Sequence, residues 1–174
     1  ANSQKCIAIN RPKNLASDNS RTFDAVIHAM EEASKLGIEF NSIVILQPTS
    51  PLRTENHINE AIHILSNDSH ESVISVCQCE HPPVWSSTLD KDLNMFNFVN
   101  DTSIGIPSQN LPKYYRLNGA LYASNVKAYK TNRGCFGNKS RAFIMDQESS
   151  IDIDNLLDFK LAEVLIKERF NKKP

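Results

Sequence analysis

The chain has 174 residues, 40% of them hydrophobic, and its 19 basic and 20 acidic residues give a formal net charge of −1. This length and composition predict one domain with a buried core and exclude a disordered chain. The balanced charge argues against a general electrostatic nucleic-acid binder, and no apolar run reaches the roughly 18 residues of a membrane-spanning helix.

The first elements expected along the chain are a strand and a helix. Residues 5–10 resemble a short strand. Over residues 20–36, apolar side chains recur at three- and four-residue spacing, which predicts a helix with one apolar face. Gly37 is a typical residue to end it. The residues that can cap its start are Asp18, Asn19 and Ser20.

Two apolar strands with a helix between them follow. Residues 43–46 are apolar on both alternating faces, which is typical of a strand covered on both sides in a parallel sheet. Thr54 can cap the next helix, and residues 72–76 form the second apolar strand. This order predicts an α/β fold with a mostly parallel sheet.

The second half of the chain is less regular. Residues 80–110 contain prolines and short aromatic pieces, and we expect loops and short antiparallel strands there. Further strands are predicted over 119–123 and 142–145. The chain ends in a helix over 155–170. Four of its apolar residues share one face, namely Leu157, Leu161, Val164 and Leu165.

A stiff polar corner follows the strand at 43–46. Gln47 stands where that strand ends, and Pro48 and Pro51 restrict the backbone on either side of two hydroxyl residues. Ligands of open α/β sheets bind beyond the carboxyl ends of strands, so this corner is a candidate binding element. The alternative is a proline-stiffened turn before a helix.

Two acidic residues near the C-terminus form a second candidate. In an extended segment Asp152 and Asp154 share one face while Ile151 and Ile153 face the core. Neighbouring carboxylates repel unless a cation lies near them, and hard oxygen ligands suit Mg²⁺ or Mn²⁺. The alternative is an ordinary strand end with Asp154 capping the last helix.

Four segments, in order along nearly the whole chain, resemble the acylneuraminate cytidylyltransferases, the CMP-sialic acid synthetases. They are RP-LASD at 11–18, LQPTSPLRT at 46–54, RLNGALY at 116–122, and SIDID with a following D and AE at 150–163. The resemblance implies a Rossmann-like nucleotidyltransferase fold and the transfer of CMP from CTP to a nine-carbon α-keto acid sugar, with release of pyrophosphate. It also implies Mg²⁺, with Mn²⁺ as a substitute, a cytoplasmic location and a homodimer in which residues 80–118 form the dimerisation arm.

The resemblance also assigns roles to individual residues. Asp152 and Asp154 would hold the metal and take part in catalysis. Arg11 and Thr22 would lie on the nucleotide side. Four residues would bind the sugar substrate, namely Gln47, Arg116, Asn118 and Tyr122.

The chain departs from the family in two places. Family members carry an early glycine-containing basic loop that grips the triphosphate, and these 174 residues have none. We therefore expect an N-terminally incomplete domain with an open position in its sheet and little turnover alone. Ser108 stands where the family often has a basic residue, so the identity of the sugar is left open.

Two other functions compete with this interpretation. One is a non-catalytic remnant that keeps the sheet and the dimer surface but cannot turn over CTP, and the missing loop is the argument for it. The other is a different D-x-D sugar-nucleotide enzyme, such as a glycosyltransferase, and the QPTSP corner argues against it.

Overall fold

The computed structural model describes residues 6–17, 19–67, 69–96, 98–99 and 104–171. These residues form four strands and four α-helices. In chain order the elements are α1 (Thr22–Lys35), β1 (Ser42–Ile45), α2 (Glu55–Asn67), β2 (Ser72–Gln78), β3 (Tyr115–Asn125), α3 (Val126–Asn132), β4 (Ser140–Ile144) and α4 (Leu156–Asn171). None of the described helices combines the length and apolar character needed to span a bilayer.

The strands form one mixed sheet in the order β1-β3-β2-β4. β2 pairs with β4 in parallel, whereas β3 pairs antiparallel with both β1 and β2. Three strands therefore share one direction, and β3 runs against them. The α/β class is confirmed. The prediction of a mostly parallel sheet is only partly met, because the apolar pattern of β3 contains no information on its direction.

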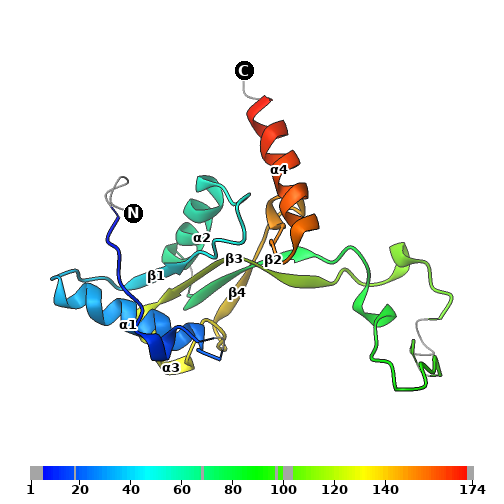
Figure 1. The fold of residues 1–174 in the computed structure, drawn as a ribbon, viewed down its shortest axis with the longest axis horizontal. Helices are drawn as coiled ribbons and strands as arrows, with labels where there is room; N and C mark the ends of the chain where they lie inside the picture. Colours follow the sequence, from blue (N-terminus) through cyan, green and yellow to red (C-terminus); the bar gives the residue numbers. More distant parts are fainter. Residues whose placement is uncertain (1–5, 18, 68, 97, 100–103, 172–174) are drawn as a thin grey trace.

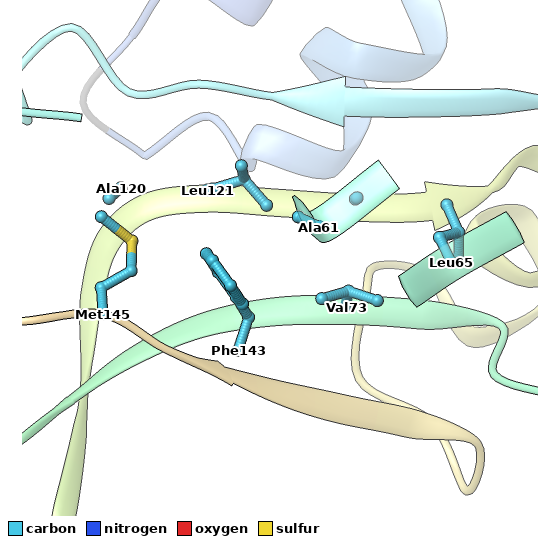
Figure 2. Packing of buried hydrophobic residues seen from close by; sticks show 8 residues of the cluster. Ala61, Leu65, Val73, Ala120, Leu121, Phe143 and Met145 are labelled. Carbon is cyan, nitrogen blue, oxygen red and sulfur yellow. The ribbon is translucent and has the colours of Figure 1, made fainter. Parts of the chain in front are cut away.

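Helices cover both faces of this sheet (Figure 1). On the α2 face, buried residues of α2, β2, β3 and β4 make one apolar cluster, shown in Figure 2: Ala61, Leu65, Val73, Ala120, Leu121, Ala123, Phe143 and Met145. On the α1 and α3 face a second cluster contains Met30, Ile74, Tyr129 and Cys135. Neighbours along a strand, such as Val73 and Ile74, go to opposite clusters, as the period of two requires.

β1 differs from its prediction in one respect. Val44 packs on the first cluster, and Ile43 and Ile45 on the second, so both faces are covered as expected. However, β1 lies at the edge of the sheet that the described residues form, and these three side chains are only half-buried. The pattern predicts covered faces correctly because faces depend on side chains, whereas edge position depends on which backbone pairs with it.

The helix ends follow local sequence. Gly37 has a φ of +77°, and its N–H and that of Ile38 donate to the carbonyls of Ser34 and Ala33, which closes α1. Thr54 caps α2 as predicted, because its Oγ1 accepts from the N–H of His57 at 3.4 Å. The start of α1 is different: its N-cap is Arg21 and makes no side-chain cap bond, and Asp18 lies outside the described residues.

Two further predictions differ from the structure. Residues 6–10 form no strand, and residue 5 lies outside the described part. Between β2 and β3, residues 79–114 form an arm that extends away from the sheet (Figure 1). Its described residues contain no strand, but two short 3₁₀ helices, Pro83–Trp85 and Ser108–Asn110. Apolar and aromatic composition without a neighbouring strand does not suffice to form one.

The face of α4 that docks on the body is not the predicted one. Ala162 is buried and Arg169 is half-buried, whereas Leu157 is 73% exposed. Leu161 and Val164 are exposed as well. Apolar residues occur all around this helix, so spacing alone could not select the face that packs.

Candidate active site

The first segment of the site is the corner that follows β1. Gln47 lies two residues beyond the carboxyl end of β1, as predicted. Arg53 fixes the corner, because its Nη1 donates to the carbonyl of Gln47 at 3.2 Å and to that of Ala120 at 2.6 Å. Partial burial lowers the pKa of Arg53 from its ordinary value. This arginine therefore ties the corner to β3.

The second segment is a bulge in β3. Ile74 of β2 is opposite Tyr122 of β3, whereas Val76 is opposite Leu117. Two residues along β2 therefore correspond to five residues along β3, and the extra residues of β3 form the bulge. Ser75 fills this irregularity: its Oγ accepts from the N–H of Leu121 at 2.7 Å and donates to Oδ1 of Asn118 at 2.6 Å. The bulge thus has an internal polar support.

Asn118 lies inside the bulge and not on its surface. It is 1% exposed, and its Oδ1 also accepts from the N–H of Ala120 at 3.2 Å. Its Nδ2 donates to Oγ of Ser150 at 2.8 Å. The predicted substrate ligand therefore sits in a buried hydrogen-bonded network that links β2, β3 and the segment before Asp152.

Gly119 is the point at which the site residues meet. It has a φ of +70°, a conformation that glycine adopts without strain. A β-carbon there would collide with the side-chain amide of Gln47 and would lie 3.1 Å from Oδ2 of Asp152. The structure thus brings Gln47 and Asp152 together over a residue that has no side chain.

The third segment, residues 146–154, contains both acidic residues. The N–H of Ile153 donates to the carbonyl of Thr49 at 2.9 Å, which joins this loop to the corner. Oδ1 of Asp152 is buried and has no hydrogen-bond partner in the part of the chain that the structure describes. A buried carboxylate oxygen without a partner is unfavourable unless a cation or donor binds it. Asp154 is exposed beside it.

Asp154 is not the cap of α4. Asn155 caps this helix, because its Oδ1 accepts from the N–H groups of Leu157 and Asp158 at 2.8 and 3.2 Å. Asp158 returns the interaction by accepting from the N–H of Asn155 at 3.0 Å. The capping role proposed as an alternative for Asp154 thus belongs to its neighbour, and the Asp154 carboxylate faces solvent.

Tyr122 and Arg116 lie on either side of this centre. Tyr122 packs on the α1 and α3 cluster; burial raises its pKa, and Cys135 and Asp152 raise it further, which places it in the electrostatic range of Asp152. Arg116 lies where β3 leaves the arm, and its Nη2 is 3.2 Å from Oε1 of Glu80. Its guanidinium is therefore already paired in this structure.

The predicted nucleotide-side residues are solvent-accessible. Arg11 and Thr22 are both exposed, and Thr22 is the first residue of α1. α1 runs back along the sheet before β1 begins, so its first turn lies at the end of the sheet where Gln47 stands (Figure 1). Ser108 is exposed in the arm, in the second 3₁₀ helix.

Comparison with known proteins agrees with this geometry. The chain is 34% identical over 164 residues to an N-acylneuraminate cytidylyltransferase from Escherichia coli, which covers 94% of this chain and 38% of the relative. It is 29% identical over 158 residues to a CMP-N,N′-diacetyllegionaminic acid synthase from Legionella pneumophila, covering 90% of this chain and 67% of the relative. The chain is similar to CMP-nonulosonate synthetases. The resemblance predicted from the sequence is thereby confirmed.

Solved structures show the same fold. A CMP:2-keto-3-deoxy-manno-octonic acid synthetase complexed with CTP superimposes with a TM-score of 0.57 at 12% identity, over 87% of this chain and 70% of that one. A 4-diphosphocytidyl-2C-methyl-D-erythritol synthase from Anaerococcus prevotii gives 0.53 at 13% identity, over 86% and 68%. The nucleotidyltransferase fold is confirmed. No family model matches the chain, which spans only 38% of the first curated relative.

Several residues that support this candidate site were not predicted from the sequence. Ser75 and Ser150 are fully buried and support Asn118, and Arg53 anchors the corner. A serine between Ile74 and Val76, in the middle of an apolar strand, is the signal that could have indicated Ser75. Arg53 belongs to the QPTSPLR segment, but spacing alone does not show that it binds carbonyls.

Proposed function

We propose that this chain forms the sugar- and metal-binding part of a cytidylyltransferase that joins CTP to a nine-carbon α-keto acid sugar, giving a CMP-sugar and pyrophosphate. The meeting of Gln47 and Asp152 over Gly119 carries this proposal. The similarity to relatives named for acylneuraminate and diacetyllegionaminic acid supports a nonulosonate as the sugar. N-acetylneuraminate is the reference substrate of that class.

The residues present fit a divalent cation. Asp152 offers a buried oxygen without a partner, and Asp154 offers an exposed carboxylate two residues later. The described residues contain no group of three or more His, Cys, Asp or Glu side chains that could hold a metal ion. Mg²⁺ suits such a site, because it commonly takes one or two carboxylates and completes its shell with phosphate oxygens and water. Mn²⁺ prefers the same oxygen ligands.

In the reaction, the anomeric hydroxyl oxygen of the sugar forms a bond to the α-phosphorus of CTP. The bond from that phosphorus to the bridging oxygen breaks, and pyrophosphate leaves. A bound cation would neutralise the negative charge on the phosphate oxygens. Asp152 would hold this cation through its partnerless Oδ1, and the adjacent exposed carboxylate of Asp154 would help to take the proton of the hydroxyl.

The other residues position the two substrates. The Gln47 amide has donors and acceptors for sugar hydroxyls, and Arg53 holds its backbone in place. Tyr122 and Arg116 complete the sugar side, with Asn118 acting beneath them through the buried network. Arg11 and Thr22 are both exposed, and we assign them to the nucleotide side, Thr22 at the start of α1.

We also propose that the arm forms a homodimer interface. We further propose that the reaction takes place in the cytoplasm, where CTP is supplied. Several large apolar side chains of the arm are exposed: Leu89, Leu93, Met95, Phe96 and Ile104. Contiguous exposed apolar surface is typical of an interaction site. Cys77, Cys79 and Cys135 are free thiols, which fits a reducing compartment.

An NMR titration of the isotopically labelled chain tests the proposal. Mg²⁺ and then N-acetylneuraminate, each to about 10 mM to exceed millimolar dissociation constants, should shift the amide signals of Gly119 and Ile153. N-acetylmannosamine, which lacks the α-keto acid end, is the matched control and should leave them in place. Unchanged signals in the presence of both Mg²⁺ and N-acetylneuraminate would overturn the assignment.

Turnover by the 174-residue chain itself should be small. We expect these residues to lack the early glycine-containing basic loop to which the family resemblance assigns the triphosphate, and each charge-assisted phosphate contact is worth about 1.5–3 kcal/mol. Pyrophosphate release with CTP, Mg²⁺ and N-acetylneuraminate should therefore stay near background. Robust CMP-sugar synthesis by this chain would show that other residues grip the triphosphate.

A further inference from the structure

Arg169, in the last turn of α4, touches two of the three site segments at once. Its Nη1 donates to the carbonyl of Leu52 at 2.6 Å, and its Nη2 donates to Oγ of Ser149 at 2.8 Å. Leu52 belongs to the corner after β1, and Ser149 belongs to the loop that carries Asp152. The half-buried guanidinium thus spans the gap between the corner and the acidic loop.

The Arg169 bridge adds to the one direct backbone hydrogen bond that the described residues form between the corner and the acidic loop. The N–H of Ile153 donates to the carbonyl of Thr49 at 2.9 Å, three residues before Leu52. The loop is also tied to β3, because Nδ2 of Asn118 donates to Oγ of Ser150 at 2.8 Å. Toward the corner, Arg169 adds a second point of attachment, so that both distance and orientation are fixed. Asp152 lies between the two attachment points of its own loop, Ser149 and Ile153. Its carboxylate is therefore held by both.

The chemistry of the contact requires an arginine. Both acceptors are neutral oxygens, and the planar guanidinium presents several donors in a fixed fork that can reach two acceptors together. Lysine is a point charge that can reach one of them. Arg169 also helps to keep the pKa of Asp146 below its ordinary value, although burial opposes this and the hydrogen bonds from Ser149 contribute more.

We propose that Arg169 is a positioning residue that locks the acidic loop to the corner and so keeps the Asp152 carboxylate in its binding position. The second half of this statement rests on the proposed function, whereas the lock itself rests on the fold alone. α4 is then capped by Asn155 at its start and attached to the corner and the acidic loop by Arg169 in its last turn.

Amide hydrogen exchange measured by NMR on the intact chain tests the lock. In Arg169→Met the amide of Ile153 should exchange at least about tenfold faster, the effect of losing roughly one charge-assisted hydrogen bond. The amide of Leu121, bonded to Ser75 in the core, should change by less than about twofold, because it opens only with the whole fold. Lys167→Met removes the same charge from an exposed pair on the same helix and should change neither.

Two results would overturn the lock: an Ile153 amide that exchanges at the same rate in both variants, or a uniform acceleration of Ile153 and Leu121, which indicates only global destabilisation. If Arg169→Met does not fold, Arg169→Lys replaces it in the same comparison of the Ile153 and Leu121 amides. Because lysine can keep one of the two hydrogen bonds, we expect the Ile153 amide to exchange only a few fold faster.

Binding of Mn²⁺, followed by the EPR signal of the free ion, tests the second half. The affinity should fall several fold in Arg169→Met and stay unchanged in Lys167→Met. If the Ile153 amide of Arg169→Met exchanges faster while that of Leu121 does not, and the Mn²⁺ affinity is nevertheless unchanged, the link between Arg169 and Asp152 is refuted. If the unaltered chain binds no Mn²⁺, the proposed metal role fails, while the exchange data still decide on the lock.

Discussion

Two regions connected by β3 have opposite character: the candidate site, which includes residues 118–121 of this strand, and the arm, which precedes it. At the site, three segments (47–53, 118–121 and 146–154) are joined by hydrogen bonds in which nearly every group has a named partner, such as Asn118 with Ser75 and Ser150. In the arm, residues 79–114, the most prominent side chain is Phe96, which is 83% exposed. One region is organised by polar contacts within the chain, and the other presents apolar surface outward.

This difference indicates where each region obtains its stability. A satisfied buried network needs no partner and can hold a site ready for substrate. Exposed apolar side chains gain free energy only when something covers them, so the proposed association would stabilise the arm. Within the site the exceptions among the described residues are Oγ of Ser50 in the corner and Oδ1 of Asp152, and the Asp152 oxygen is the atom we assign to the metal.

The largest effect should come from the carboxylates. Asp152→Asn or Asp154→Asn keeps size and removes a negative charge, and each should lower turnover in a catalytically active form of the protein by roughly 10²–10³-fold, as for other preorganised electrostatic groups. In the present chain, Mn²⁺ affinity should fall correspondingly. Asn155→Ala is the control: it removes the helix cap and costs about 1 kcal/mol of stability, but should leave Mn²⁺ affinity intact. Near-normal turnover in Asp154→Asn would remove this residue from the metal site.

Breaking the polar network should reduce stability. Asn118→Ala removes one hydrogen bond each from Ser75 and Ser150, which keep their bonds to Leu121 and Asp146. It also leaves the buried Ala120 N–H unsatisfied, at a cost of about 1–3 kcal/mol. We expect the free energy of unfolding, measured with denaturant, to fall by about 2–4 kcal/mol. The exposed Asn138→Ala should change it by less than about 0.5 kcal/mol. Equal effects of the two would mean that the network contributes nothing to stability.

The arm should respond to substitution in the opposite way. Phe96→Ser removes an exposed apolar side chain, so the melting temperature of the monomer should be unchanged while the dimer dissociation constant rises about tenfold, or about 1.4 kcal/mol. Sedimentation velocity measures this constant. Leu36→Ser, an exposed apolar residue at the end of α1, is the matched control. If the unaltered chain is monomeric at tens of micromolar, roughly the range of modest interfaces, the arm is not a dimer interface.

The sequence predicted elements whose signal is local. α1 and α2 follow from apolar spacing, and Gly37 and Thr54 mark their ends by backbone and capping chemistry that involve only near neighbours. The position of Gln47 at the end of β1 also followed, since a strand and a proline suffice to define it. The site assignments came from a resemblance between segments and not from these local signals.

What sequence could not predict depends on contacts between distant segments. The direction of β3, the edge position of β1 and the docked face of α4 are each determined by which backbone or surface lies alongside. Arg169 donates a hydrogen bond to the carbonyl of Leu52, 117 residues away, and no periodic pattern in the sequence predicts such a bond. Polar residues that support a site are therefore the hardest to find, because a buried serine and a surface serine look alike in a sequence.

The last effect concerns the apolar cluster on the α1 and α3 face and appears only at high pH, so at neutral pH it is absent. Cys135 is 4% exposed, and burial raises the pKa of its thiol to about 11 from an ordinary value of 9.0. Between these two values the unfolded chain loses the thiol proton while the folded chain retains it. Stability from this group is thus complete below about pH 9 and is lost as the pH rises toward 11, by at most about 2–3 kcal/mol.

Denaturant unfolding between pH 8 and pH 10.5 measures this loss. Cys135→Ala should reduce the slope but not abolish it, because burial also raises the pKa of Cys77, and raises that of Tyr129 to about 12. Cys79→Ala, which keeps Cys135, should retain the full slope. Burial raises the pKa of Tyr122 as well, and all four groups lie in β2, β3, α3 or the turn that follows α3. None lies in the arm, so Phe96→Ser should leave the slope unchanged. A slope that disappears in Phe96→Ser instead would mean that the arm and the core unfold as one unit, against the separation drawn between them.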